Sequence, residues 1–195
     1  MCFITLFHRK GYIMRVITGS ARGRKLETLS GDDVRPTTDK VKEAVFSAIQ
    51  FDIEGRSFLD LFAGSGQMGI EALSRGAKSA TFVDKSRKSV DIVRKNLNSV
   101  GFYEKAKVFH ADSIAFIDST TDLYDIVYLD PPFGSGLLQN ALPKIAEKMK
   151  KTGVIIAENE ENEVILQKYG EFVLDRQKHY GKIKVSMYRH KDFVL

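Results

Sequence analysis

The sequence of 195 residues contains a single cysteine, Cys2, and no tryptophan. One cysteine can form neither an internal disulfide framework nor a cysteine metal cluster, so we expect no metal. No apolar run approaches the roughly 18 residues that a membrane-spanning helix needs. The apolar start, Met1 to Phe7, is followed by its charges, Arg9 and Lys10, instead of being preceded by them, which makes it a poor secretory signal. These absences favour a cytoplasmic protein without a membrane segment.

The positive charge of the chain is concentrated at its two ends. The formal net charge is +5, yet residues 1–30 carry six Lys or Arg against Glu27, and residues 176–195 carry six against Asp192. Each end therefore has a charge of +5, which leaves −5 for residues 31–175. Basic ends on an acidic body favour contact between the ends and a polyanion. The alternative is a solvated surface whose charge is merely uneven.

Strand and helix patterns alternate through most of the chain. Short apolar runs predict strands over residues 58–62, 80–83, 106–109, 125–129 and 154–157, and helices are predicted over 67–75, 86–100, 113–117, 137–149 and 161–169. A further helix begins at Thr37 or Thr38 and ends before Gly55, and residues 172–190 form a terminal hairpin. Such alternation predicts an α/β fold, a mostly parallel sheet with helices on both faces and a reversed strand at its edge.

The beginning of the chain divides into three parts. Residues 1–13 have no helix or strand pattern beside them with which they could pack. We therefore expect a dispensable extension or a misassigned start, and a chain that begins at Met14 should fold and bind its cofactor. Residues 14–34 predict a small basic β-hairpin, whose tip carries Arg22, Arg24 and Lys25. The main domain is predicted over residues 35–195, where 43% hydrophobic content in the chain suffices for one full core.

The tetrapeptide Asp130-Pro131-Pro132-Phe133 follows a buried strand and precedes a glycine-rich turn. Prolines have a φ of about −65° and no N–H, so this turn presents carbonyl acceptors with few competing donors. A carboxylate and an aromatic ring stand beside them. Two acceptors and a flat face suit a nucleobase with an exocyclic amine, although Asp-Pro-Pro by itself also occurs as an ordinary end of a strand.

A second glycine-rich segment follows the first predicted strand. Gly64, Gly66 and Gly69 lie at a strand-loop-helix junction and match the GxGxxG pattern of dinucleotide-binding folds. Glycines let the backbone approach a ligand closely, and the helix that follows offers free N–H groups. The pattern alone does not distinguish nicotinamide cofactors from S-adenosylmethionine.

Three acids at the ends of successive strands favour S-adenosylmethionine. Asp60 precedes the loop, where a carboxylate attracts an ammonium group and repels a pyrophosphate. Asp84 stands 20 residues after Gly64, the spacing of an acid that accepts the ribose hydroxyls of either cofactor. Asp112 is placed to meet an adenine amino group. Helix N-capping is the alternative role for Asp84 and Asp112.

These motifs, together with Gly23-Arg24-Lys25-Leu26, Arg35-Pro36-Thr37-Thr38 and the segment Gly69-Ile70-Glu71-Ala72-Leu73, resemble those of class I S-adenosylmethionine-dependent N-methyltransferases, and specifically the bacterial 16S ribosomal RNA guanine-N2 methyltransferases of the RsmD family. The resemblance runs from Met14 to the C-terminus. It implies a Rossmann-like fold with a seven-stranded sheet whose last strand is antiparallel, and a basic N-terminal hairpin that touches RNA.

The resemblance also implies a reaction and its partners. The expected reaction is methylation of the N2 amine of guanine 966 in 16S ribosomal RNA, within an assembling 30S particle and by a monomer. The candidate catalytic residues are Asp130, Pro131 and Phe133. The candidate cofactor site comprises Thr37, Asp60, Phe62, Gly64, Gly66, Gln67, Asp84, Lys85, Asp112 and Ser113, and the candidate RNA contacts are Arg22, Arg24, Lys25 and Arg35.

Three other functions compete with this one. A DNA or RNA adenine or cytosine N-methyltransferase uses the same tetrapeptide, but the DNA enzymes usually carry a sizeable recognition domain for which this chain has no insert. A nicotinamide-dependent oxidoreductase explains the glycines and leaves Asp130 to Phe133 unused. A non-catalytic RNA-binding module explains the basic ends but not a cofactor loop beside an amine-binding turn.

Overall fold

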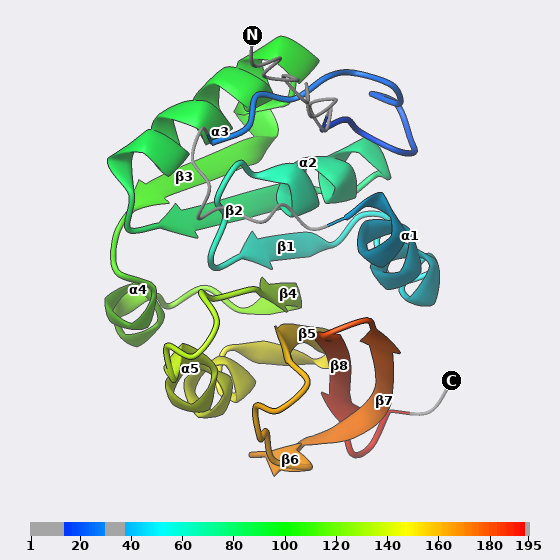
Figure 1. Cartoon of the computed structure of the whole chain (residues 1–195), viewed down its shortest axis with the longest axis vertical. Coiled ribbons are helices and arrows are strands. Elements are labelled where there is room, and N and C mark those ends of the chain that lie inside the picture. The colour runs from blue at the N-terminus through cyan, green and yellow to red at the C-terminus, as the bar shows by residue number, and fades with distance from the viewer. Residues whose placement is uncertain (1–13, 30–37, 194–195) are drawn as a thin grey trace, which may run out of the picture.

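Five parallel strands form the part of the sheet that organises the fold (Figure 1). The computed structural model describes residues 14–29 and 38–193. The parallel strands are β1 (Ser57–Asp60), β2 (Ser79–Asp84), β3 (Ala106–His110), β4 (Tyr124–Leu129) and β5 (Met149–Glu160), and they lie in the order β3-β2-β1-β4-β5. The chain runs outward from β1 through β2 to β3 and then crosses back to β4 on the other side of β1. Ligands of open α/β sheets bind at such a reversal of strand order.

Alternate residues of the strands point to opposite faces of the sheet, as the period of two requires. Phe58 and Ile126 pack in one core with α1 (Asp39–Ala48), α2 (Gln67–Ser74) and α3 (Arg87–Val100). Leu59 and Val127 pack in a second core with α4 (Ser113–Ser119) and α5 (Leu137–Ala146). A short 3-10 helix, η1 (Tyr103–Lys105), precedes β3. The predicted helices on both faces are therefore confirmed, with α5 ending earlier than expected.

The sheet continues with three antiparallel strands, β8 (Ile183–His190), β7 (Phe172–Tyr180) and β6 (Lys168–Tyr169). The predicted terminal hairpin is confirmed, because β7 and β8 pair from Phe172 opposite His190 to Tyr180 opposite Ile183. The sheet has eight strands where seven were expected. The additional strand, β6, is only two residues long and pairs with the outer edge of β7.

The helix predicted over residues 161–169 is absent from the described structure, and that prediction was wrong. Strand β5 is longer than predicted because it pairs with β8 as far as Glu160 opposite Ile183. In the turn that follows, the side chains of Asn159 and Lys184 donate to the carbonyl of Glu163, which satisfies an acceptor without a helix. A helix there would also have to bury its apolar side chains, whereas Val164 is 77% exposed.

Residues 14–29 form a short antiparallel hairpin, in which Arg15 forms a bridge with Lys25 and backbone hydrogen bonds join Val16 to Arg24 and Leu26 to Met14. The segment lies beside α2 and α3 (Figure 1). Met14 and Val16 are buried in the same core as the three helices on that face. Among the described residues, no helix is both long and apolar enough to cross a membrane.

Candidate functional site

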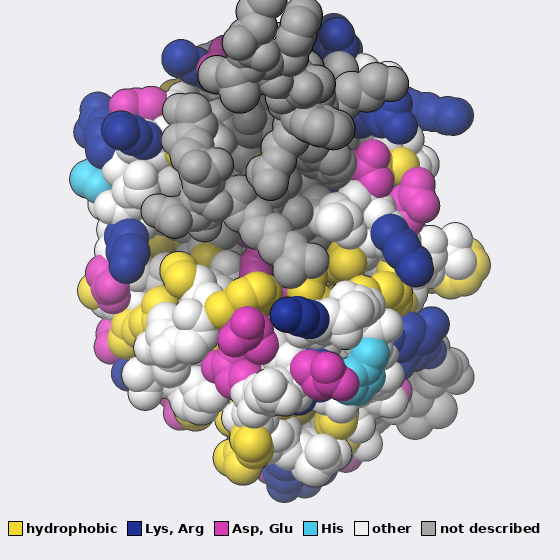
Figure 2. Space-filling model, in the orientation of Figure 1, with side chains coloured by type: hydrophobic (Ala, Val, Ile, Leu, Met, Phe, Trp, Pro, Cys, Tyr) yellow, Lys and Arg dark blue, Asp and Glu magenta, His cyan; other side chains and the backbone are white. Residues whose placement is uncertain are grey.

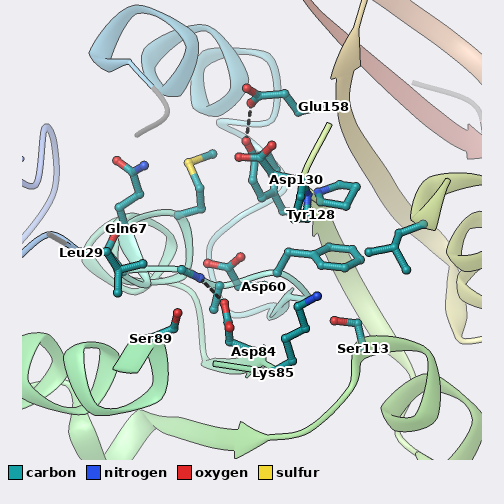
Figure 3. A pocket seen from close by; sticks show the side chains of 18 of the residues that line it. Leu29, Asp60, Gln67, Asp84, Lys85, Ser89, Ser113, Tyr128, Asp130 and Glu158 are labelled. Carbon is teal, nitrogen blue, oxygen red and sulfur yellow. Dashed lines mark hydrogen bonds between the residues drawn. The ribbon is translucent and has the colours of Figure 1, made fainter. Parts of the chain in front are cut away.

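A cavity of about 690 Å³ lies at the carboxyl ends of the parallel strands (Figure 3). Asp60 ends β1, Asp84 ends β2, and Asp130 follows β4 directly. Because the strands are parallel, these ends meet along one edge of the sheet. The cavity therefore lies beside the β1–β4 switch point that the strand order indicates.

Most of the candidate residues surround this one cavity. The lining includes Asp60, Phe62, Gly64, Gln67, Asp84, Lys85, Asp112, Ser113, Asp130, Pro131 and Phe133. Gly66 is the N-cap of α2 and stands in the chain between two lining residues, Ser65 and Gln67. Arg22, Arg24 and Lys25 are exposed and do not line it, while Thr37 and Arg35 fall outside the described residues. The sequence motifs thus converge in space, and the individual roles of these residues stay predictions.

The glycine loop is shaped by one carboxylate and by close packing. Asp84 accepts hydrogen bonds from the backbone N–H of Gly64 at 2.8 Å and of Ser86 at 2.8 Å. Gly64 has a φ of 54°, a left-handed conformation that glycine adopts without strain. At Gly69 an added Cβ would lie 2.3 Å from the ring of Phe82, so this glycine lets α2 approach β2. Asp84 therefore holds the loop as well as facing the cavity.

Asp60 is a deeply buried acid on the floor of the cavity. Its side chain is 2% exposed and accepts the N–H of Gly69 at 3.1 Å. The pKa of Asp60 is raised from 3.8 to about 7, mainly by burial; the Gly69 N–H lowers this pKa and the negative charge of Asp84 raises it. A nearby cation would favour the ionised form of this carboxyl group.

Asp112 caps the helix that follows it. One carboxylate oxygen accepts the N–H groups of Ile114 and Ala115, at 2.9 Å and 3.0 Å, so the N-capping alternative is realised. The hydroxyl of Ser113 donates to the carbonyl of Leu61 at 2.9 Å, which ties α4 to the end of β1. Capping uses one oxygen of Asp112, and the residue still lines the cavity.

The cavity is lined by acids. Its described lining contains five carboxylates, from Asp60, Asp84, Asp112, Asp130 and Glu158, against Lys85 as the one basic side chain there. Gln67 adds a further acceptor, because its buried Oε1 has no hydrogen-bond partner among the residues that the structure describes. Such a lining attracts cations and N–H donors and disfavours anions.

Sequence reasoning missed a second group of acids and aromatics beside the tetrapeptide. Tyr128 and Glu158 both line the cavity, and the Tyr128 hydroxyl donates to Glu158 Oε2 at 2.5 Å. Figure 3 shows these two side chains with Asp130 at one end of the cavity, Asp84, Lys85 and Ser113 at the other, and Asp60 between them. Asp130 is half-buried and Phe133 is 39% exposed, so the tetrapeptide reaches from the interior to the surface.

The basic N-terminal segment contributes to the same cavity, which the sequence also did not show. Met14, Thr28 and Leu29 line it, and the Ser65 hydroxyl of the glycine loop donates to the Met14 sulfur at 3.2 Å. The segment is held by the buried carboxylate of Glu71, which accepts the backbone N–H groups of Ile17 and Thr18.

Comparisons with known proteins agree with this geometry. The family described as conserved hypothetical protein 95 matches residues 14–189. The Bacillus subtilis protein YlbH is 37% identical over 183 residues, which are 91% of this chain and 100% of that protein. The Haemophilus influenzae protein named ribosomal RNA small subunit methyltransferase D is 34% identical over 182 residues, covering 91% of this chain and 94% of its own length.

A solved structure supports the fold as well. The yhhF protein of Escherichia coli has a TM-score of 0.81 and 31% sequence identity, and the match covers 92% of this chain and 98% of that chain. The resemblance to the RsmD family and the class I methyltransferase fold are thereby confirmed.

Proposed function

The chain belongs to the family described as conserved hypothetical protein 95, whose relatives include ribosomal RNA methyltransferases, and we propose that its cavity binds S-adenosylmethionine and directs methylation of a guanine N2 amine in 16S ribosomal RNA. Ribosomal RNA methylation follows from the family. The proposal adds that the methylated atom is the N2 amine of guanine 966 and that the substrate is an assembling 30S particle.

The acidic lining of the cavity is the observation that carries this proposal. S-adenosylmethionine has a sulfonium and an ammonium group, and five carboxylates against one lysine suit those charges. A nicotinamide cofactor brings a pyrophosphate, which the carboxylate of Asp60 at the glycine loop would repel. The oxidoreductase alternative therefore fits this cavity poorly.

Several described residues match the donors and acceptors of the cofactor. Asp60 and the unpaired Gln67 Oε1 are acceptors for an ammonium group, and Asp84 stands at the end of β2 for ribose hydroxyls. The second carboxylate oxygen of Asp112 suits an adenine amino group. When bound, S-adenosylmethionine supplies an electrophilic methyl group on sulfur.

The residues after β4 match the chemistry of the other reactant. The N2 lone pair of guanine is delocalised into the ring, so the nitrogen is a weak nucleophile until its N–H bonds are held out of the ring plane. The Asp130 carboxylate and the Pro131 carbonyl would accept these N–H groups and stabilise positive charge as it develops on the nitrogen. Phe133, partly exposed at the mouth, would stack on a base drawn out of its helix or already unpaired.

We propose that the basic N-terminal segment contacts the RNA. Arg22 and Lys25 are exposed at its tip, and Arg24 donates to the carbonyl of Ser99. On the face seen in Figure 2, Lys and Arg side chains lie in separate groups interspersed with acidic ones. Phosphate contacts from such groups position an RNA without reading its sequence.

Methylation of total RNA with labelled S-adenosylmethionine, followed by mapping of the modified nucleotide, tests the proposal. We expect one labelled guanine in 16S ribosomal RNA and binding of S-adenosylhomocysteine but not NADH. The Asp130→Asn variant should lower kcat by about 10²–10³ with little change in RNA affinity, because a preorganised acceptor is lost only from the transition state. Asp122→Asn, at an exposed site before the same strand, is the matched control. Normal turnover by Asp130→Asn would refute the mechanism.

A further inference from the structure

Glu158 is a buried acid that the mechanism above does not use. Its side chain is 2% exposed, yet it lines the cavity. The pairing of β4 with β5 aligns Tyr128 with Ile156 and Leu129 with Ala157, so the next residues along, Asp130 and Glu158, are lateral neighbours. Alternation along each strand places both on the sheet face of Tyr128. Two acids therefore stand side by side where the tetrapeptide begins.

The orientation of Glu158 is fixed from the sheet. The Tyr128 hydroxyl donates to Oε2 at 2.5 Å, and Tyr128 itself is 1% exposed. A carboxylate has about four acceptor positions, so it can hold a fixed hydroxyl and a donor from a ligand at the same time. Burying an acid is costly, and a packed core position would be served better by an apolar residue. A carboxylate held in this way at a ligand cavity is suited to receive a donor from a ligand.

We propose that Glu158 accepts the N1–H of the target guanine and so selects guanine over other bases; this inference rests on the proposed function. Guanine presents N1–H and the N2 amine next to each other on its Watson–Crick edge. Asp130 and Glu158 would meet these adjacent donors with adjacent carboxylates. Glu158 is thus a specificity-determining residue, while Asp130 acts at the nitrogen that receives the methyl group.

The same pair of acids rejects the other amino bases. Adenine and cytosine each carry an exocyclic amine, but the ring nitrogen beside it is an unprotonated acceptor. Placing that lone pair against the Glu158 carboxylate leaves two acceptors facing each other without a proton. A site built to accept a substrate N–H discriminates strongly against an analogue that lacks it. The adenine and cytosine methyltransferase alternatives are disfavoured on this ground.

The sharpest test replaces the target guanine of a 16S ribosomal RNA fragment by 2-aminopurine, which keeps the N2 amine but has an acceptor at N1. The wild-type enzyme should prefer guanine by at least about 10- to 100-fold in kcat/KM, the effect of one hydrogen bond to a charged group. In Glu158→Gln the Tyr128 hydroxyl should hold the amide oxygen, which turns the amide N–H toward the base. That donor suits 2-aminopurine and opposes guanine, so the preference should fall by about tenfold or more.

A binding measurement separates base recognition from chemistry. Because 2-aminopurine fluoresces when it leaves the base stack, titration of the modified RNA with enzyme and S-adenosylhomocysteine reports capture of the base without methyl transfer. We expect Glu158→Gln to capture 2-aminopurine more tightly than the wild type. The exposed neighbour on the same strand supplies the control, since Glu160→Gln should leave both the preference and the capture unchanged.

The possible outcomes distinguish this inference from the proposed function. An unchanged guanine preference in a folded Glu158→Gln variant overturns the role of Glu158 and leaves guanine methylation standing. Methylation of a base other than guanine by the wild type overturns both. Should Glu158→Gln fail to fold, Tyr128→Phe removes only the hydroxyl that orients Glu158, and it should reduce the guanine preference while S-adenosylhomocysteine affinity stays the same. An unaltered preference in Tyr128→Phe would then refute the inference.

Discussion

Replacing Asp60 by asparagine should stabilise the protein at neutral pH and weaken cofactor binding at the same time. The asparagine side chain keeps an oxygen that can accept the N–H of Gly69, but it has no proton to lose. The variant therefore removes the charge of Asp60 and preserves its shape. Opposite effects on stability and on binding are expected because the buried charge is costly without a cation beside it.

The magnitude follows from the pKa of Asp60. Burial raises this pKa from 3.8 to about 7, so the neutral form is favoured in the folded state. The resulting stability is complete below pH 3.8 and is lost as the pH rises through about 7. Since one pKa unit corresponds to about 1.4 kcal/mol, Asp60 lowers the free energy of unfolding by up to about 4 kcal/mol between these limits. Asp60→Asn should escape this loss.

Urea unfolding of both proteins across the pH range 4 to 8.5 measures the effect, and their difference cancels the titration of other groups. The difference should grow in favour of Asp60→Asn as the pH rises. Calorimetric titration with S-adenosylmethionine should show weaker binding by the variant above pH 7, where a bound cation favours ionised Asp60. A stability difference that does not vary with pH would show that Asp60 does not titrate in this range. Undiminished affinity would show that it does not face the cofactor cation.

Three other variants test separate parts of the site. Asp84→Ala should weaken S-adenosylmethionine binding by about 1.5–3 kcal/mol, the value of a hydrogen bond to a charged group, and calorimetry that finds equal affinity would reject the assignment. Charge reversal at Arg22 and Lys25 should weaken RNA binding and lower the slope of log affinity against log salt by roughly 0.7–0.9 per lost phosphate contact, with cofactor affinity unchanged. An unaltered slope would mean that these side chains are only solvated. Phe133→Ala should remove stacking worth about 1–3 kcal/mol per base. Single-turnover methyl transfer at saturating cofactor should then need a higher RNA concentration for half-saturation and should be slower at saturating RNA. Unchanged values of both would show that Phe133 does not contact the base.

The convergence of the four strand-end acids could be predicted from the sequence. Asp60, Asp84, Asp112 and Asp130 each follow an apolar run, and the alternation of strands with helices makes the strands parallel. Parallel strands bring their carboxyl ends to one edge, so residues far apart in the chain meet there. No knowledge of the strand order is needed for this step.

The position of Glu158 beside Asp130 could not be predicted, because it depends on which strand lies beside β4. Its signal in the sequence is an acid just after the apolar run that ends at Ala157, in a strand expected to stop there. Pairing with β8 extends β5 beyond that point and carries Glu158 into the sheet beside Asp130. The same pairing explains why the prediction of a helix over residues 161–169 was wrong. Long-range pairing overrides local pattern in both cases.

The basic N-terminal segment is best understood as part of the site instead of an attached arm. Buried Glu71 accepts the N–H groups of Ile17 at 2.8 Å and Thr18 at 2.9 Å, and Arg75 pairs with the same carboxylate at 2.9 Å. Glu71 lies on α2, the helix that the glycine loop opens. The exposed tip is therefore fixed relative to the cavity that Met14 helps to line. An RNA phosphate bound at that tip would be held at a set distance from the tetrapeptide, and such positioning lowers the entropic cost of bringing a base to the methyl group.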